Sequence, residues 1–118
     1  MLLMTRLIIF LVSGMLFLST GARAEEIYLN CIFTRNANTQ ISLSYNTDSK
    51  TGKQYVGQGL FIPYDLELSN SDITLIRKYE GKFVQSWNIN RYNGNASFYS
   101  AESTAPAIYF CTKVNQKF

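Results

Sequence analysis

Short stretches in which apolar and polar residues alternate fill most of the chain after its first 24 residues. In the stretch TQISLSYN (39–46), the Ile, Leu and Tyr residues fall on one side of an extended strand, as a half-buried strand requires. The other predicted strands include 26–35, 54–62, 64–69, 73–79, 82–92 and 107–114. No window in this part of the chain has a convincing helical repeat. About seven to eight short strands at near-regular spacing predict an all-β fold, either a small antiparallel barrel or a closed sandwich.

Glycine, proline and clustered polar residues indicate where these strands bend or end. The polar stretch TDSKTGK (47–53) is expected to be a turn. Gly57 and Gly59 interrupt the apolar run QYVGQGLFI (54–62), so we expect a bulge or bend within one strand there, with Pro63 at its end. The strand after this proline is expected to direct its two leucines inward and its two acidic residues outward.

The stretch SWNINRYNGNASFYS is typical of a β-hairpin. Its Asn93-Gly94 pair fits a two-residue type I′ turn, in which both positions need a positive φ. In the strand before the turn, Phe83 and Trp87 share one face, which predicts that Trp87 is a core aromatic residue. The alternative is that Trp87 belongs to an exposed binding platform. Arg91 shares this face near the turn, where it either covers the end of the core or offers a cation to a partner.

Residues 1–24 have the three parts of a secretory signal peptide. A basic residue precedes the apolar run LIIFLVSGMLFL, and the small residues of Ala22-Arg23-Ala24 fit a cleavage site. The run is shorter than the roughly 20 apolar residues that cross a membrane, so we expect cleavage after Ala24 and no membrane attachment afterwards. Residues 25–118 are expected to form a single β domain that is periplasmic or secreted.

Charge and side-chain chemistry argue against several classes of function. Residues 25–118 carry nine basic and eight acidic side chains, too small an excess to neutralise a row of phosphates, so nucleic acid is excluded as the main partner. The chain has no histidine, which removes the usual general base and every imidazole metal ligand. Asp65 and Glu67 could serve acid/base chemistry or bind calcium, but alternating charges on an outer strand face are typical of a solvated surface. We therefore expect no enzyme activity, no metal and no cofactor.

The two cysteines, Cys31 and Cys111, are the only pair that the chain offers. Cys31 lies on the apolar face of the first predicted strand and Cys111 on that of the last. An exported compartment lets a disulfide persist, and a small domain benefits from one because its core is limited. The pair lacks the Cys-x-x-Cys spacing of redox-active thiols. We therefore predict an intramolecular disulfide that joins the first and last strands of a monomeric domain.

Aromatic residues are abundant, with eight Tyr, six Phe and one Trp among residues 25–118. Such tyrosines either pair across strands on a half-buried sheet or form a surface that recognises another protein. The candidate partner-binding residues are Trp87, Arg91, Tyr92, Asn93 and Tyr99. We expect a small exported binding protein whose partner is another protein, for example an inhibitor of a cell-wall hydrolase. The alternative is a carrier of a small apolar ligand inside a barrel lined by these aromatic residues.

The layout of the chain resembles that of a known family of exported proteins. YLNC opens the first strand, about 80 residues of β pattern follow, and YFC lies in the last. This layout resembles the small periplasmic lysozyme inhibitors of Gram-negative bacteria, typified by the membrane-bound lysozyme inhibitor of c-type lysozyme. The resemblance implies an eight-stranded antiparallel barrel stapled by its disulfide, with a loop that plugs the lysozyme cleft.

One motif of that family has no counterpart in this chain. The inhibitory Ser-Gly-x-x-Tyr signature differs from both NGNASFY and GQGLFIPY, the nearest candidates, so the resemblance assigns no inhibitory residue. The INRYNG run followed by a C-terminal cysteine is also similar to small exported proteobacterial proteins. That second similarity implies a compartment and no activity.

Overall fold

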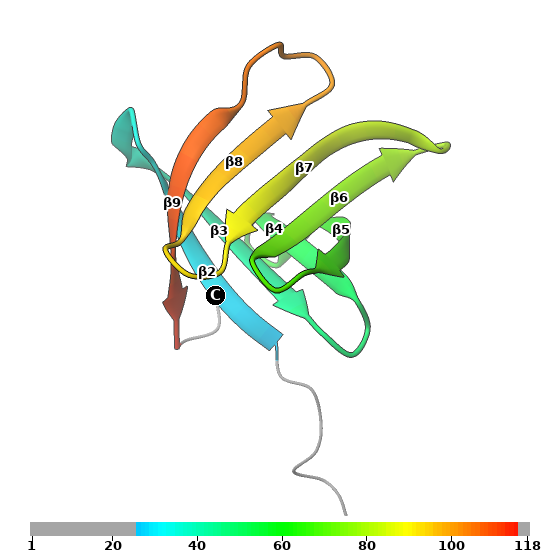
Figure 1. Cartoon of the computed structure of the whole chain (residues 1–118), viewed down its shortest axis with the longest axis horizontal. Coiled ribbons are helices and arrows are strands. Elements are labelled where there is room, and N and C mark those ends of the chain that lie inside the picture. Colours follow the sequence, from blue (N-terminus) through cyan, green and yellow to red (C-terminus); the bar gives the residue numbers. More distant parts are fainter. Residues whose placement is uncertain (1–25, 116–118) are drawn as a thin grey trace, which may run out of the picture.

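The computed structural model describes residues 26–115, which form a closed barrel of eight antiparallel strands (Figure 1). The strands are β2 (Glu26–Phe33), β3 (Asn36–Asn46), β4 (Thr51–Gly57), β5 (Leu60–Leu68), β6 (Asp72–Tyr79), β7 (Lys82–Asn90), β8 (Asn95–Ser100) and β9 (Ala107–Val114). Each strand pairs with the next along the chain, and β2 also pairs with β9, which closes the barrel. The predicted all-β fold is confirmed, and it is the barrel rather than the sandwich. The predicted signal peptide (1–24) lies outside the described residues.

A disulfide between Cys31 on β2 and Cys111 on β9 joins the first and last strands, as predicted. The two cysteines are direct partners across the β2–β9 ladder, and both are buried. The bond closes a loop with a sequence separation of 80, so it ties together the two strands that lie farthest apart along the chain. Such a disulfide is consistent with an oxidising, exported compartment.

Inward-facing residues from most of the strands fill the barrel interior. The buried apolar residues are Leu29, Cys31, Leu43, Tyr45, Tyr64, Leu66, Ile73, Leu75, Trp87, Ile89, Ala96, Tyr109 and Cys111. Trp87 lies among them with only 1% of its surface exposed. Its ring centroid is 4.9 Å from that of Phe98 and 4.9 Å from that of Tyr109. The prediction of Trp87 as a core aromatic residue is therefore confirmed.

The stretch 54–62 is not one strand, as predicted, but two strands joined by a tight turn. The predicted bulge is present beside Gly57, as a register shift between Tyr55 and Gly57 in the β4–β5 ladder. β4 ends at Gly57 and β5 begins at Leu60, while Gly59 in the turn has a φ of 77°, a conformation that favours glycine. The turn was missed because this register shift offsets the change of phase at the turn, so inward positions are even-numbered in both strands. Pro63 consequently lies inside β5 rather than at the end of a strand.

Two apolar residues predicted to face the core are exposed at strand ends. Leu68, the last residue of β5, is 44% exposed, and Phe83, near the start of β7, is 43% exposed. A register shift between β6 and β7 separates Phe83 from Gln85. This bulge breaks the alternation before Trp87, so Phe83 does not follow Trp87 into the core. The alternation therefore predicts burial in the middle of each strand and fails near its ends.

The predicted hairpin at Asn93-Gly94 is present, but its turn is not type I′. β7 ends at Asn90 and β8 begins at Asn95, so the loop has four residues. Gly94 has a φ of 81°, whereas Asn93 is not among the residues with a positive φ. The Oδ1 atom of Asn90 accepts hydrogen bonds from the backbone N–H groups of Tyr92 at 2.9 Å and of Asn93 at 3.1 Å. This side-chain bonding stabilises the longer loop and replaces the predicted two-residue turn.

Candidate functional site

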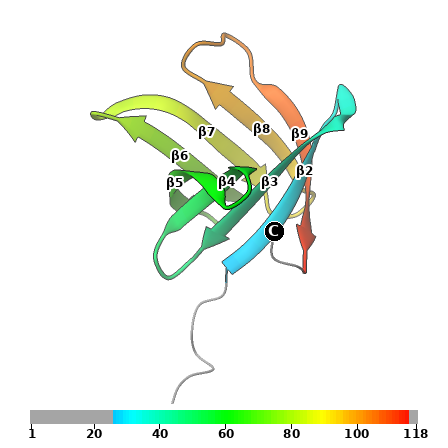
Figure 2. The same cartoon turned by 180° about the vertical axis from the view of Figure 1, so that it is seen from behind.

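Successive turns of the barrel lie at opposite ends of the strands (Figures 1 and 2). We call the end with the β4–β5, β6–β7 and β8–β9 turns the upper end, and the end with the β3–β4, β5–β6 and β7–β8 turns the lower end. Arg91, Tyr92 and Asn93 lie together in the β7–β8 turn at the lower end. Tyr99 lies near the upper end of β8 and is 43% exposed. The structure therefore groups three of the predicted partner-binding residues and places Tyr99 apart from them.

Trp87, the remaining candidate, is not available to a partner. Its ring lies inside the barrel, so the alternative interpretation of an exposed platform is wrong. The physical reason is that β7 alternates regularly on this side of its bulge and directs Trp87 toward the barrel axis together with Ile89. A partner could touch the indole only if the barrel opened.

Trp87 instead belongs to a polar network inside the barrel. Its Nε1–H donates to Oε1 of Gln54 at 3.2 Å, and the Tyr64 hydroxyl donates to the same oxygen at 2.6 Å. The Nε2 amide of Gln85 donates to the Tyr64 hydroxyl. These buried and half-buried groups satisfy one another, so the network specifies one arrangement of the core. The sequence did not predict this network, because a glutamine at an inward position of an alternating stretch looks like a break in the apolar pattern.

Tyr64→Phe is expected to change how stability depends on pH. Burial raises the pKa of Tyr64 above its usual value, so the folded state holds the phenolic proton more tightly than the unfolded chain does. The difference in pKa contributes to the free energy of unfolding. That contribution is complete below about pH 10, the ordinary tyrosine pKa, and is lost as the pH rises through the pKa of Tyr64 in the folded state. Urea unfolding at a series of pH values should give a shallower alkaline loss of stability for Tyr64→Phe. At neutral pH the variant should be less stable by about 1–3 kcal/mol, because Gln54 and Gln85 lose a buried partner.

A matched control removes a phenol where it is not buried. Tyr92, in the β7–β8 turn, is 79% exposed, so Tyr92→Phe tests the loss of a hydroxyl without the loss of a network. An alkaline profile for Tyr64→Phe identical to that of the wild type would contradict the predicted contribution of Tyr64.

A pocket of about 490 Å³ opens at the lower end of the barrel beside the β7–β8 turn. Buried side chains such as Tyr45 and Ile73 form part of its lining, and Arg91 and Lys113 are its charged residues. Burial raises the pKa of Tyr45, and the nearby Arg91 charge opposes this shift. Nη1 of Arg91 also donates to the carbonyl oxygen of Ser69 at 2.7 Å. Arg91 thus ties two lower-end turns together, which gives it a structural role.

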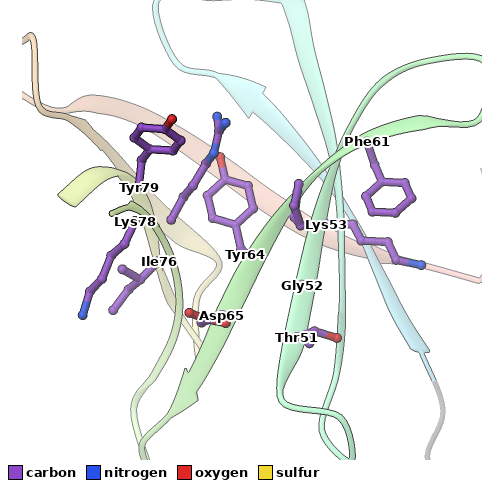
Figure 3. A pocket seen from close by; sticks show the side chains of 11 residues that line it. Thr51, Gly52, Lys53, Phe61, Tyr64, Asp65, Ile76, Lys78 and Tyr79 are labelled. Carbon is purple, nitrogen blue, oxygen red and sulfur yellow. The ribbon is translucent and has the colours of Figure 1, made fainter. Parts of the chain in front are cut away.

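A second pocket, of about 550 Å³, opens in the barrel wall between β5 and β6 (Figure 3). We call it the lateral cleft; its lining residues are Thr51, Gly52, Lys53, Phe61, Pro63, Tyr64, Asp65, Ile76, Arg77, Lys78 and Tyr79. β5 pairs with β6 from Leu68↔Ile73 up to Asp65↔Ile76 and no further. The β4–β5 and β6–β7 hairpins therefore separate above that last pair, and the cleft lies between them.

Exposed aromatic and aliphatic side chains surround the lateral cleft. Tyr79 is 68% exposed on the β6 side, and Phe61 is 45% exposed on the β5 side. The β4–β5 hairpin adds Val56 and Leu60, which are 55% and 66% exposed. Large apolar groups of this kind gather on protein surfaces where a partner binds.

The charges of the cleft are mostly positive. Nζ of Lys53 lies 3.5 Å from a carboxylate oxygen of Glu26 and 4.8 Å from the centre of the Phe61 ring. Within the described part of the chain this is the only ion pair. Arg77 and Lys78 therefore line the cleft without an acidic partner, and Asp65 is its one carboxylate. The cleft can thus attract an acidic group.

Asp65 and Glu67, the carboxylates considered for acid/base chemistry, are both exposed on β5. Asp65 lines the lateral cleft and Glu67 lines a separate pocket beside the β3–β4 turn, so the two groups do not face a common cavity. Among residues 26–115, no group of three or more His, Cys, Asp or Glu side chains could hold a metal ion. The same residues include no helix long and apolar enough to cross a membrane.

Sequence reasoning missed the lateral cleft as a site. Two signals were present: Pro63 inside an alternating strand, and the run Arg77-Lys78-Tyr79 directly after an apolar stretch. Neither signal locates a cleft alone, because the two segments meet only through the β5–β6 register.

Comparisons with known proteins add no relative to this geometry. No protein-family model matches the sequence, and neither a curated protein nor a solved structure matches the chain. The functional inference therefore depends on the site itself.

Proposed function

We propose that the protein is an exported, non-catalytic binding module whose partner is another protein, for example a cell-wall hydrolase that it inhibits. The observation that carries this proposal is the lateral cleft, where exposed aromatic rings surround two cations that have no acidic partner. Aromatic residues and arginine are the residue types that contribute most to protein interfaces. The periplasm or the extracellular space is the proposed location, and the disulfide supports it.

A carrier of a small apolar ligand inside the barrel has less support. Trp87, Leu43 and Leu75 occupy the interior with at most 1% of their surfaces exposed. A carrier needs an enclosed, lined interior space of a few hundred cubic ångströms, whereas the two pockets described above are open to the surface. Their positions favour a partner that binds from outside.

Capture experiments with two double variants test the proposal and locate the contact. The protein, produced by export so that its disulfide forms, is immobilised and exposed to a periplasmic extract. We expect wild type to capture a protein saturably, and Phe61→Ala/Tyr79→Ala to reduce capture at least about tenfold, since exposed aromatic residues are common interface hot spots. Arg91→Ala/Tyr92→Ala, at the opposite end of the barrel, serves as the matched control and should retain capture.

The captured protein then identifies the activity to assay. If it is a cell-wall hydrolase, its rate of cell-wall lysis should fall as the protein is added, and the cleft variant should not inhibit. Thermal melting of each variant excludes unfolding as the cause. Absence of any captured protein, together with stoichiometric binding of an apolar dye or fatty acid, would instead favour the carrier. If only the Arg91→Ala/Tyr92→Ala variant lost capture, the partner would bind at the lower end of the barrel and not at the lateral cleft.

A further inference from the structure

Pro63 lies at the point where pairing between β5 and β6 stops. The backbone N–H of Leu66 donates to the carbonyl oxygen of Lys50, on the β4 side of β5. Backbone groups of successive residues in a strand point to opposite neighbours. Phe61, Pro63 and Asp65 therefore direct their backbone groups toward β6, and Pro63 has no N–H to donate.

This proline explains the lateral cleft. Asp65↔Ile76 is the last pair of the β5–β6 ladder, and the next hydrogen-bonded pair would join Pro63 to Lys78. Because proline cannot donate, that pair loses one of its two hydrogen bonds, and proline is tolerated in strands mainly at an unpaired edge. The ladder ends there, and the two hairpins separate.

Two short strand edges consequently face the cleft. In the pairing that the structure describes, residues of β5 before Asp65 have no partner on β6, and Lys78 has none on β5. The N–H and C=O groups of Phe61 and of Lys78, together with the C=O of Pro63, point toward the cleft by the same alternation. An exposed strand edge is a template for an added strand.

The side chains along these edges differ between the two faces of the wall. On the inner face Arg77 follows Ile73 and Leu75 in the alternation of β6, and its positive charge acts on the Tyr64 hydroxyl. On the outer face lie the apolar groups of Phe61 and Pro63, flanked by the charged groups of Asp65 and Lys78. A complementary strand therefore presents carboxylates toward Arg77 and apolar side chains outward.

We propose that the lateral cleft binds an extended segment of the partner protein in which acidic and apolar residues alternate, and that the segment adds as a strand to the open edges of β5 and β6. This inference rests on the proposed function, since it assumes a protein partner, and it specifies the chemistry of the contact. Lys53 is a weaker candidate for the segment's carboxylates because Glu26 already neutralises it.

Short peptides with blocked ends test the binding chemistry. The probe is a hexapeptide of alternating Glu and Val, titrated into ¹⁵N-labelled protein at low salt. We expect the amide signals of Phe61 and Lys78 to shift. A Gln-Val peptide should bind about five- to tenfold more weakly, because partly exposed ion pairs each contribute modestly. A Glu-Val peptide with alternate backbone nitrogens methylated should also bind more weakly, since it cannot form a full ladder.

Protein variants test the residues. Arg77→Gln should weaken binding of the Glu-Val peptide about fivefold and abolish most of its advantage over the Gln-Val peptide. Arg35→Gln is the matched control, because Arg35 is an exposed arginine in the β2–β3 turn away from the cleft, and it should leave both affinities unchanged. Equal affinity of the Glu-Val and Gln-Val peptides for the wild type would overturn the acidic preference. Equal affinity of the methylated peptide would overturn strand addition.

Pro63→Val tests the origin of the cleft. Valine supplies the missing N–H, so the β5–β6 ladder should extend to Lys78 and close the cleft. We expect weaker binding of the Glu-Val peptide and a higher melting temperature, whereas Pro106→Val, in the β8–β9 loop, should leave binding unchanged. Undiminished binding by Pro63→Val would overturn the role of Pro63.

The proposed function and this inference fail separately. If wild type captures a protein from the extract but no Glu-Val peptide shifts the cleft amides, the acidic-strand inference is wrong and the binding function stands. If neither capture nor peptide binding occurs, both are wrong.

Discussion

Replacing both cysteines by alanine is expected to lower the free energy of unfolding by about 4–5 kcal/mol. The disulfide closes a loop with a sequence separation of 80, and on the chain-entropy model a loop of that size loses this much stabilisation when the bond is removed. A small domain is typically stable by only about 5–15 kcal/mol. The double variant should therefore be partly or wholly unfolded at 37 °C, as urea unfolding followed by tryptophan fluorescence would measure.

Reduction provides the internal control for this prediction. Within the described residues the structure has no free cysteine, so dithiothreitol should destabilise wild type by a similar amount and leave the Cys31→Ala/Cys111→Ala variant unaffected. If the free energy of unfolding fell by less than about 1 kcal/mol, the β2–β9 ladder and the surrounding core would be sufficient to close the barrel without the disulfide. Mass spectrometry of the oxidised protein should also detect no free thiol.

The closure of the barrel could be predicted from the sequence because its determinants are local. Alternation places Cys31 and Cys111 on the apolar faces of their strands, and those strands are the first and last. A disulfide between two inward-facing residues forces the chain ends together. Fold class, topology at the closing pair and the position of Trp87 follow from these patterns.

The strand boundaries around Gly57 and Gly59 could not be predicted in the same way. A two-residue turn alone would change the inward positions from even to odd numbers, but the register shift between Tyr55 and Gly57 keeps them even-numbered on both sides. The pattern alone therefore does not distinguish this hairpin from one continuous strand. Pro63 misled the prediction for a related reason. Proline is excluded from a strand with two paired neighbours but is compatible with an edge, and whether β5 has such an edge depends on the β5–β6 register.

The lateral cleft could not be predicted from the sequence, for a further physical reason. The alternation states which face a side chain is on, but not which residues of a neighbouring strand lie opposite. Arg91, Tyr92 and Asn93 are adjacent in sequence and were therefore grouped correctly. The lateral cleft joins residues near 61–65 to residues near 76–79, and their proximity follows from tertiary register alone.

Gly94→Ala is expected to destabilise the protein by at least about 3 kcal/mol, because two unfavourable effects coincide at this position. Gly94 has a φ of 81°, a conformation that is strained for a residue with a Cβ. A Cβ there would also lie 2.3 Å from the carbonyl oxygen of Cys111. That oxygen belongs to the β9 backbone, which cannot move aside easily, since the Cys111 N–H donates to the Gly94 carbonyl at 2.8 Å. Gly94→Val should be worse still.

Three other glycines separate these two effects. Gly59 has a φ of 77° and no atom within 4 Å of an added Cβ, so Gly59→Ala should lose only about 1–2 kcal/mol from backbone strain. Gly52 has no positive φ, but its Cβ would lie 2.4 Å from Cδ2 of Leu75, so Gly52→Ala should lose about 1–3 kcal/mol from overpacking. Gly57→Ala, with neither effect, should change stability by less than about 0.5 kcal/mol. Urea unfolding of the four variants should give the lowest free energy of unfolding for Gly94→Ala. If Gly94→Ala were no worse than Gly59→Ala, the β7–β8 turn would have to move away from β9 at little energetic cost, and the close approach to Cys111 would not be a constraint on this fold.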